Sequence, residues 1–160
     1  MREALLFVTK GGRDFDQGFS YVAELAKTLK MDISMLMVYN RRVIEAYEDV
    51  MSAAVFAEAG EFNTAKDILQ EKENEFKAAA EKKLRELSVK YDISSDIKCH
   101  VRIGDALSSL NDFLKKTHHI NMVLVSPSLS KSKKEIDMNK LIKKISKPIV
   151  TISQPAEAGA

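Results

Sequence analysis

The residues best suited to chemistry are hydroxyl and ammonium groups that gather in two short segments. One segment is rich in serine and lysine and runs from Ser126 to Lys134, directly after an apolar run. The other follows the first apolar run of the chain and contains Gly11 and Gly12. Hydroxyls and cations hold anions, and glycines let backbone amides close on a phosphate. The two segments therefore indicate an anion or nucleotide site, although a solvated basic loop explains the same residues.

Other residue types in the chain offer little chemistry. Cys99 is the only cysteine and alternates with polar neighbours, so we predict an inert thiol on the buried side of a strand. His118 and His119 close a helical pattern, and no carboxylate or third histidine stands at a metal-ligand spacing from them. We predict no metal site, no catalytic set and no cofactor.

The two anion-binding segments must be brought together by the fold, which the hydrophobic pattern predicts. Short apolar runs predict five strands, at 3–9, 33–39, 97–103, 122–125 and 148–152. Apolar residues at helical spacing predict helices at 16–29, 44–55, 64–91, 105–114 and within 131–146. Strands separated by helices predict a single doubly wound α/β domain. Ligands of such domains bind at the carboxyl ends of the strands, where the winding reverses. The candidate residues of this cleft are Val8, Lys10, Gly11, Gly12, Val38, Ser126, Ser128 and Ser130.

Several local signals predict where the helices begin. Asp14 or Asp16 is expected to cap the first helix, Thr64 the helix at 64–91, and Asp105 the helix that follows it. At about 1.5 Å per residue the helix at 64–91 is roughly 40 Å long, which exceeds the depth of a typical sheet. We therefore expect half of it to overhang the domain. The strand at 97–103 alternates apolar and polar residues, which predicts an edge strand with one wet face.

The composition describes an ordinary globular chain of 160 residues, with 25 basic and 23 acidic residues and a net charge of +2. This near-balance gives no reason to expect nucleic acid as a partner. No apolar stretch is long enough for a membrane span, so we expect no membrane partner and a cytoplasmic location. The predicted organisation is one domain over 1–153, with 40–75 as a variable helical insertion and 154–160 as a disordered tail.

Three segments in this order resemble the universal stress protein family. They are the strand–helix–strand opening with 21–29 as its helix, the Gly104-Asp105 step before a later helix, and a terminal strand introduced by Lys147-Pro148. The resemblance implies a Rossmann-like, five-stranded parallel sheet with the strand order 3-2-1-4-5. It also implies a homodimer formed through the fifth strand, by Ile149, Val150, Thr151 and Ile152.

Many members of that family bind ATP through a loop after the fourth strand, patterned Gly-x-x-Gly with a Gly-Ser or Gly-Thr step downstream. Here Ser126 and Leu129 stand at the first two glycines, and Glu135 or Asn139 stands at the third. Lys10 replaces the aspartate that contacts the nucleotide in ATP-binding members. The chain therefore resembles the branch of the family that lacks the ATP-binding glycine motif.

The charges are unevenly distributed along the chain. Residues 45–75 contain nine acidic residues and two lysines, whereas residues 131–148 contain seven lysines and two acidic residues. Either segment could bind a charged protein partner, although solvated helix faces are the commoner explanation of such a pattern.

These observations predict a non-enzymatic, universal-stress-protein-like module with a binding or regulatory role in the stress response. The alternative is a member that binds ATP or AMP, or hydrolyses ATP weakly, through Gly11-Gly12 and the serine-rich loop.

Overall fold

The computed structural model describes residues 3–10, 18–39, 60, 62–93, 97–130 and 136–152. The predicted helix at 44–55 and the predicted tail at 154–160 lie outside these residues. The elements in chain order are β1 (Ala4–Lys10), α1 (Phe19–Leu29), β2 (Asp32–Tyr39), α4 (Phe62–Lys90), β3 (Ile97–Ile103), α5 (Ala106–Lys116), β4 (Ile120–Val125), α6 (Pro127–Ser130), α7 (Met138–Lys144) and β5 (Ile149–Thr151).

The five strands form one parallel sheet in the order β3-β2-β1-β4-β5. This confirms the predicted doubly wound α/β fold and its strand order. The three central strands are apolar because helices cover both of their faces. β3 carries buried Cys99 and Val101, and the exposed residues Lys98 and Arg102 stand on either side of them. The predicted edge strand with one wet face is therefore confirmed.

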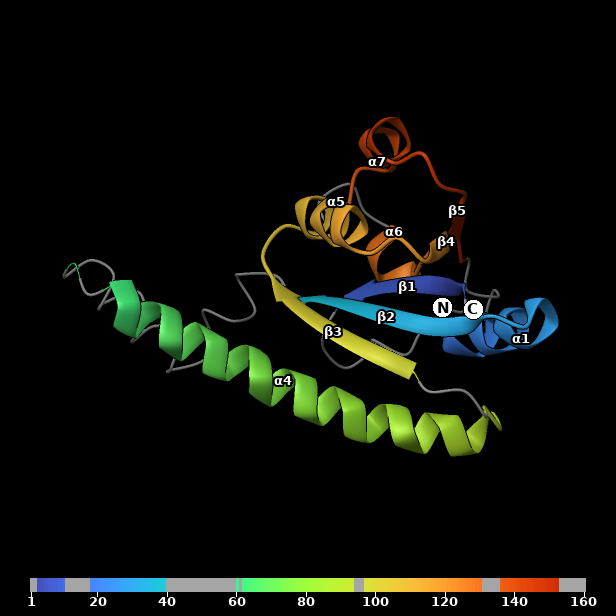
Figure 1. Cartoon of the computed structure of the whole chain (residues 1–160), viewed down its shortest axis with the longest axis horizontal. Coiled ribbons are helices and arrows are strands. Elements are labelled where there is room, and N and C mark those ends of the chain that lie inside the picture. The colour runs from blue at the N-terminus through green and yellow to red at the C-terminus, as the bar shows by residue number, and fades with distance from the viewer. Residues whose placement is uncertain are drawn as a thin grey trace, which may run out of the picture.

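Helices cover the two faces of the sheet in separate layers (Figure 1). On one face, α1 and α4 pack on residues such as Leu5 and Phe7. On the other face, α5, α6 and α7 pack on residues such as Leu6 and Val8. Successive strand residues point to opposite faces, so a continuous apolar run supplies both cores at once.

α4 is much longer than the strand it accompanies. It has 29 residues, which corresponds to about 44 Å at 1.5 Å per residue. Among the residues of α4 whose burial is described, the buried ones are Ala80, Leu84 and Leu87, in the second half of the helix. Figure 1 shows the first half of α4 running past the end of β3. The predicted overhang is therefore present in the structure.

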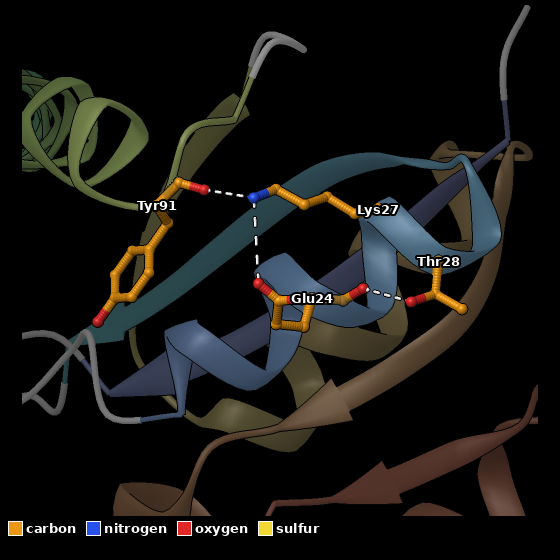
Figure 2. Close-up of polar contacts among 4 residues, drawn as sticks. All are labelled: Glu24, Lys27, Thr28 and Tyr91. Atoms are coloured by element: carbon orange, nitrogen blue, oxygen red, sulfur yellow. Dashed lines mark hydrogen bonds and ion pairs between the residues drawn. The ribbon is translucent and has the colours of Figure 1, made fainter.

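The far end of α4 is tied to α1 by a single lysine (Figure 2). The Lys27 ammonium donates to the carbonyl oxygen of Tyr91 at 2.6 Å, and it lies 4.0 Å from a carboxylate oxygen of Glu24. The Thr28 hydroxyl donates to the Glu24 carbonyl one turn earlier. The Tyr91 ring packs against Phe19 of α1, with ring centroids 5.7 Å apart. These contacts fix the helix layer on this face of the sheet.

The helix starts differ from the sequence prediction at two places. α1 begins at Phe19, and its cap position is Gly18, which has a left-handed backbone and makes no side-chain cap bond. The predicted cap at Asp14 or Asp16 is therefore wrong. α4 begins at Phe62, so Thr64 lies inside the helix. The predicted cap of α5 by Asp105 is confirmed, because the Asp105 side chain accepts the N–H of Ser108 at 2.9 Å.

Among the described residues, no helix combines the length and the apolar character needed to cross a membrane.

Candidate functional site

The winding of the sheet reverses between β1 and β4, so the crevice at their carboxyl ends is where the fold would place a ligand. The short helix α6 follows β4 directly and contacts β1. Its residues Pro127, Ser128 and Leu129 are all buried. The crevice is therefore occupied by a turn of helix instead of the loop that the sequence predicted.

Two serines form a buried hydroxyl pair in this crevice. The side-chain oxygens of Ser126 and Ser128 lie 2.7 Å apart, and the two residues are 0% and 6% exposed. The Lys10 backbone N–H donates to the Ser128 hydroxyl at 3.4 Å. No buried side-chain nitrogen or oxygen in the described part of the chain lacks a hydrogen-bond partner. The hydroxyls of Ser126 and Ser128 are thus bonded within the protein itself.

Two backbone amides of α6 are also bonded within the chain. Pro127 has no N–H, and the N–H groups of Leu129 and Ser130 both donate to the Ser126 carbonyl at 3.1 Å. The Ser126 N–H donates to the Val8 carbonyl at 2.9 Å. A phosphate cradle needs several backbone N–H groups directed at one anion. Within 126–130, the Leu129 and Ser130 amides are bonded to the chain itself and are not directed at an anion.

The predicted cleft residues divide into three groups. Val8 and Val38 are buried in the core under α5 and α6, at 0% and 3% exposure, and do not line a cleft. Lys10 and Ser130 are half-buried beside the serine pair. The other two predicted residues, Gly11 and Gly12, lie outside the described residues. The structure therefore brings Lys10, Ser126, Ser128 and Ser130 together, with Val8 and Val38 in the core beside them.

Gly18 stands at the start of α1 and lies close to Ile152 and Pro127, at the other side of the same crevice. Its backbone is left-handed, with φ +85°. A Cβ placed on Gly18 would lie 3.0 Å from Ile152 and 3.4 Å from Pro127. Ile152 is only 7% exposed because it is held in this contact and in the core beside it. The Ile152 side chain therefore packs within its own chain, and its part in a dimer interface stays a prediction.

The outer edge of β5 carries a different pair of residues. The Ile152 N–H donates to the Val125 carbonyl, and the Pro148 carbonyl accepts the N–H of Val123. Backbone polar groups alternate between the two edges of a strand, so those of Ile149 and Thr151 point away from β4. In the described part of the chain β5 pairs only with β4, which leaves this edge open.

A groove between α4 and β3 was not predicted from the sequence. It encloses about 700 Å³ and is lined by Lys77, Glu81, Leu84, Arg85, Ser88, Val89, Ile93, Ile97, Lys98, Cys99 and His100. The one sequence pattern that bears on this groove is the alternation of apolar and polar residues in β3, because it identifies β3 as an edge strand. The pairing of that edge with α4 depends on the long-range packing of the helix.

Burial shifts the pKa of two titratable side chains in this groove toward the neutral form. Burial raises the pKa of the Cys99 thiol to about 11, and the carboxylate of Glu81 adds to the effect. Burial also lowers the pKa of His100, and the nearby cations Arg102 and Lys77 lower it further. A thiol with a raised pKa is a poor nucleophile, so Cys99 is the inert core residue that the sequence predicted.

Within the described ranges, no three histidine, cysteine or acidic side chains gather closely enough to hold a metal ion.

The fold of this chain is shared by solved universal stress protein structures. Hypothetical protein MJ0577, the subject of a structure-based assignment of biochemical function, is 17% identical, covers 98% of this chain and 99% of its own, and has a TM-score of 0.56. Universal stress protein UspA from Lactobacillus plantarum is 13% identical over 95% and 98% of the two chains, with a TM-score of 0.55. The universal stress protein from Archaeoglobus fulgidus, solved in complex with dAMP, is 12% identical over 96% and 98%, with a TM-score of 0.50.

No protein-family model matches the sequence, and no curated protein matches it significantly. The predicted resemblance to universal stress proteins is thus confirmed as a likeness of fold.

Proposed function

We propose that this chain is a universal stress protein of the branch that does not bind ATP through the usual loop. In this proposal it acts in the cytoplasm as a non-enzymatic binding or regulatory module in the stress response. The likeness of its whole fold to universal stress proteins supports the family. The absence of a phosphate cradle among the described residues after β4 supports the branch.

The observation that carries the proposal is the closed crevice. The Ser126 and Ser128 hydroxyls bond to each other, and the Leu129 and Ser130 amides bond to the Ser126 carbonyl. A phosphate would have to break these bonds and expose buried groups before it could bind. Buried polar groups lose about 1–3 kcal/mol each when left unpaired, so this rearrangement opposes binding.

The nucleotide content of the purified protein tests this proposal. Protein purified without added nucleotide is denatured by heat, and the released supernatant is separated by ion-exchange chromatography. We expect no stoichiometric nucleotide. ATP or AMP released in a one-to-one ratio with the chain would overturn the proposal.

We further propose a homodimer formed by the open edge of β5. The outward backbone groups of Ile149 and Thr151 could pair with the same edge of a second copy, and half-buried Val150 would pack beside them. An unpaired apolar edge favours such pairing. Thr151→Pro removes an outward N–H and keeps the β4 ladder, whereas Thr151→Ala keeps every backbone group.

Light scattering after size-exclusion chromatography tests the dimer. At micromolar concentration the wild type and Thr151→Ala are expected to be dimers, and Thr151→Pro a monomer. A monomeric wild type would contradict the proposal, and so would a dimer that Thr151→Pro leaves intact.

The second candidate function is nucleotide binding at the same end of the sheet. It is favoured by the Archaeoglobus fulgidus protein, which was solved in complex with dAMP. Half-buried Lys10 and Ser130 are the residues that could contact an anion there. A rise in melting temperature on titration with ATP and magnesium would favour this candidate. An unchanged melting temperature would favour the closed crevice.

A further inference from the structure

The free edge of β3 presents unpaired backbone groups. In the described part of the chain β3 pairs only with β2. Gly104 donates its N–H to the Tyr39 carbonyl of β2 at 3.0 Å, which sets the direction of the backbone at the end of the strand. Backbone groups alternate between the two edges of a strand. Since Gly104 points toward β2, those of Ile97, Cys99 and Val101 point away from β2.

A side chain confirms this direction independently. The Arg102 guanidinium folds back and donates to the Val101 carbonyl at 3.0 Å, which agrees with a carbonyl that points away from β2. No comparable bond joins the outward groups of Ile97 or Cys99 to another described residue. These two residues therefore offer two N–H donors and two carbonyl acceptors.

The groove of about 700 Å³ follows this edge. It touches the four consecutive residues Ile97–His100, whose side chains alternate between the two faces of the sheet. A groove in contact with all four must run along the edge of the strand. Its opposite wall is the second half of α4, which contributes Leu84 and Val89. The Val89 side chain is 83% exposed, so it can pack on a partner.

The groove is positively charged. Lys77, Arg85 and Lys98 line it and are exposed, against the single acidic residue Glu81. None of the three cations forms an ion pair with another described residue. Burial is the main cause of the lowered pKa of His100, and Lys77 and Lys98 are among the cations that lower it further. The charges also keep two β3 edges apart, which disfavours a second copy of the chain as the occupant.

We propose that this groove binds an extended acidic peptide of a partner protein, which adds to the sheet as a strand beside β3. The outward groups of Ile97 and Cys99 pair with the peptide backbone. The cations of the groove contact its carboxylates, and its apolar side chains pack on exposed Val89. Strand addition takes its affinity from main-chain hydrogen bonds and its specificity from the alternate side chains.

Fluorescence anisotropy with a labelled hexapeptide of alternating glutamate and valine tests the charge of the groove. We expect saturable binding that weakens with added salt. Arg85→Glu combined with Lys98→Glu should weaken binding about tenfold, because it replaces attraction by repulsion. Lys143→Glu on α7 is the matched control, since it reverses an exposed charge on the other face of the sheet. It should leave binding unchanged, and the melting temperature of each variant shows whether it is folded.

Backbone methylation of the peptide tests the mode of binding. One version carries N-methyl groups on every valine and the other on every glutamate, so that each blocks one edge of the peptide. Only one edge can pair with β3, and we expect one version to bind and the other to fail. The proposal would be overturned by no saturable binding of the parent peptide, by binding that the charge reversals leave unchanged, or by equal binding of both methylated versions. None of these outcomes depends on whether the crevice beside Ser126 binds a nucleotide.

Discussion

The hydroxyl oxygens of Ser126 and Ser128 lie 2.7 Å apart in a site closed to solvent. They stand after the fourth strand, where the winding of the sheet reverses and the fold would place a ligand. Polar groups that stabilise one another in this way are not free to bind an anion. This hydroxyl pair therefore supports the proposal that the chain does not bind ATP through the loop after β4.

Breaking the pair should destabilise the fold. Ser128→Ala leaves the Ser126 hydroxyl and the Lys10 N–H buried without this partner, and we expect a loss of about 1–2 kcal/mol in unfolding free energy. The loss in the Ser126→Ala, Ser128→Ala double variant should be smaller than the sum of the single losses. Urea denaturation measures all three, and Ser20→Ala, an exposed serine on α1, is the control. Strictly additive losses would mean that the two hydroxyls do not interact.

Gly18 and Gly60 provide a matched pair for measuring the contact with Ile152. Their φ angles are +85° and +84°, but only at Gly18 would an added Cβ have atoms within 4 Å. Gly60→Ala should cost about 1 kcal/mol from the backbone alone. Gly18→Ala should cost about 1–3 kcal/mol more, because its methyl group meets Ile152 at 3.0 Å. Equal losses of stability in denaturant unfolding would contradict the packing of β5 on α1.

Replacing Lys27 tests the link between α1 and the end of α4 (Figure 2). Its ammonium donates to the Tyr91 carbonyl at 2.6 Å, where a helix end carries partial negative charge. The side chain is 41% exposed, so we expect Lys27→Met to cost only about 0.5–1.5 kcal/mol. Lys82→Met removes an exposed lysine from α4 itself and should change the unfolding free energy by less. A larger loss in Lys82→Met would refute the role assigned to Lys27.

His100 should make stability depend on pH on the acidic side. Burial and the cations around it hold its pKa below 6.5 in the folded state. The unfolded chain therefore binds a proton first as the pH falls. The stabilising contribution of neutral His100 is present above about pH 6.5 and is lost as the pH falls through the folded pKa.

Thermal unfolding between about pH 7.5 and pH 5 measures this effect. His100→Gln should lose less melting temperature over that range than the wild type, whereas His118→Gln, at an exposed position, should follow the wild type. If His100→Gln loses as much melting temperature as the wild type over this range, the pH dependence comes from other groups.

The sequence predicted the sheet well because strand burial has a simple pattern. Continuous apolar runs such as 122–125 mark strands covered on both faces, and alternation in 97–103 marks the edge. Asp105 was predicted as a helix cap because its type and place before an apolar pattern suffice. These signals are local, so one sequence contains them.

The site was harder to predict because it depends on packing between distant segments. Ser126-Pro127 is a possible helix start, with proline at the first helical position. The serines and lysines that follow it favour a loop, and this local pattern hides the short helix α6. Ile152 looked like part of an open edge strand, and only the approach of Gly18 shows that it is buried. The groove beside β3 arises where α4 returns along the edge, which no local pattern encodes.

The most direct test of the closed crevice is a titration of ¹⁵N-labelled protein with magnesium and ATP, followed by the amide signals of Lys10, Leu129 and Ser130. The titration should extend to about 5 mM, enough to detect a dissociation constant near 1 mM. We predict that these signals keep their positions throughout. Saturable shifts at these three amides would show that α6 opens to admit a nucleotide, and would contradict a crevice closed by its own hydrogen bonds.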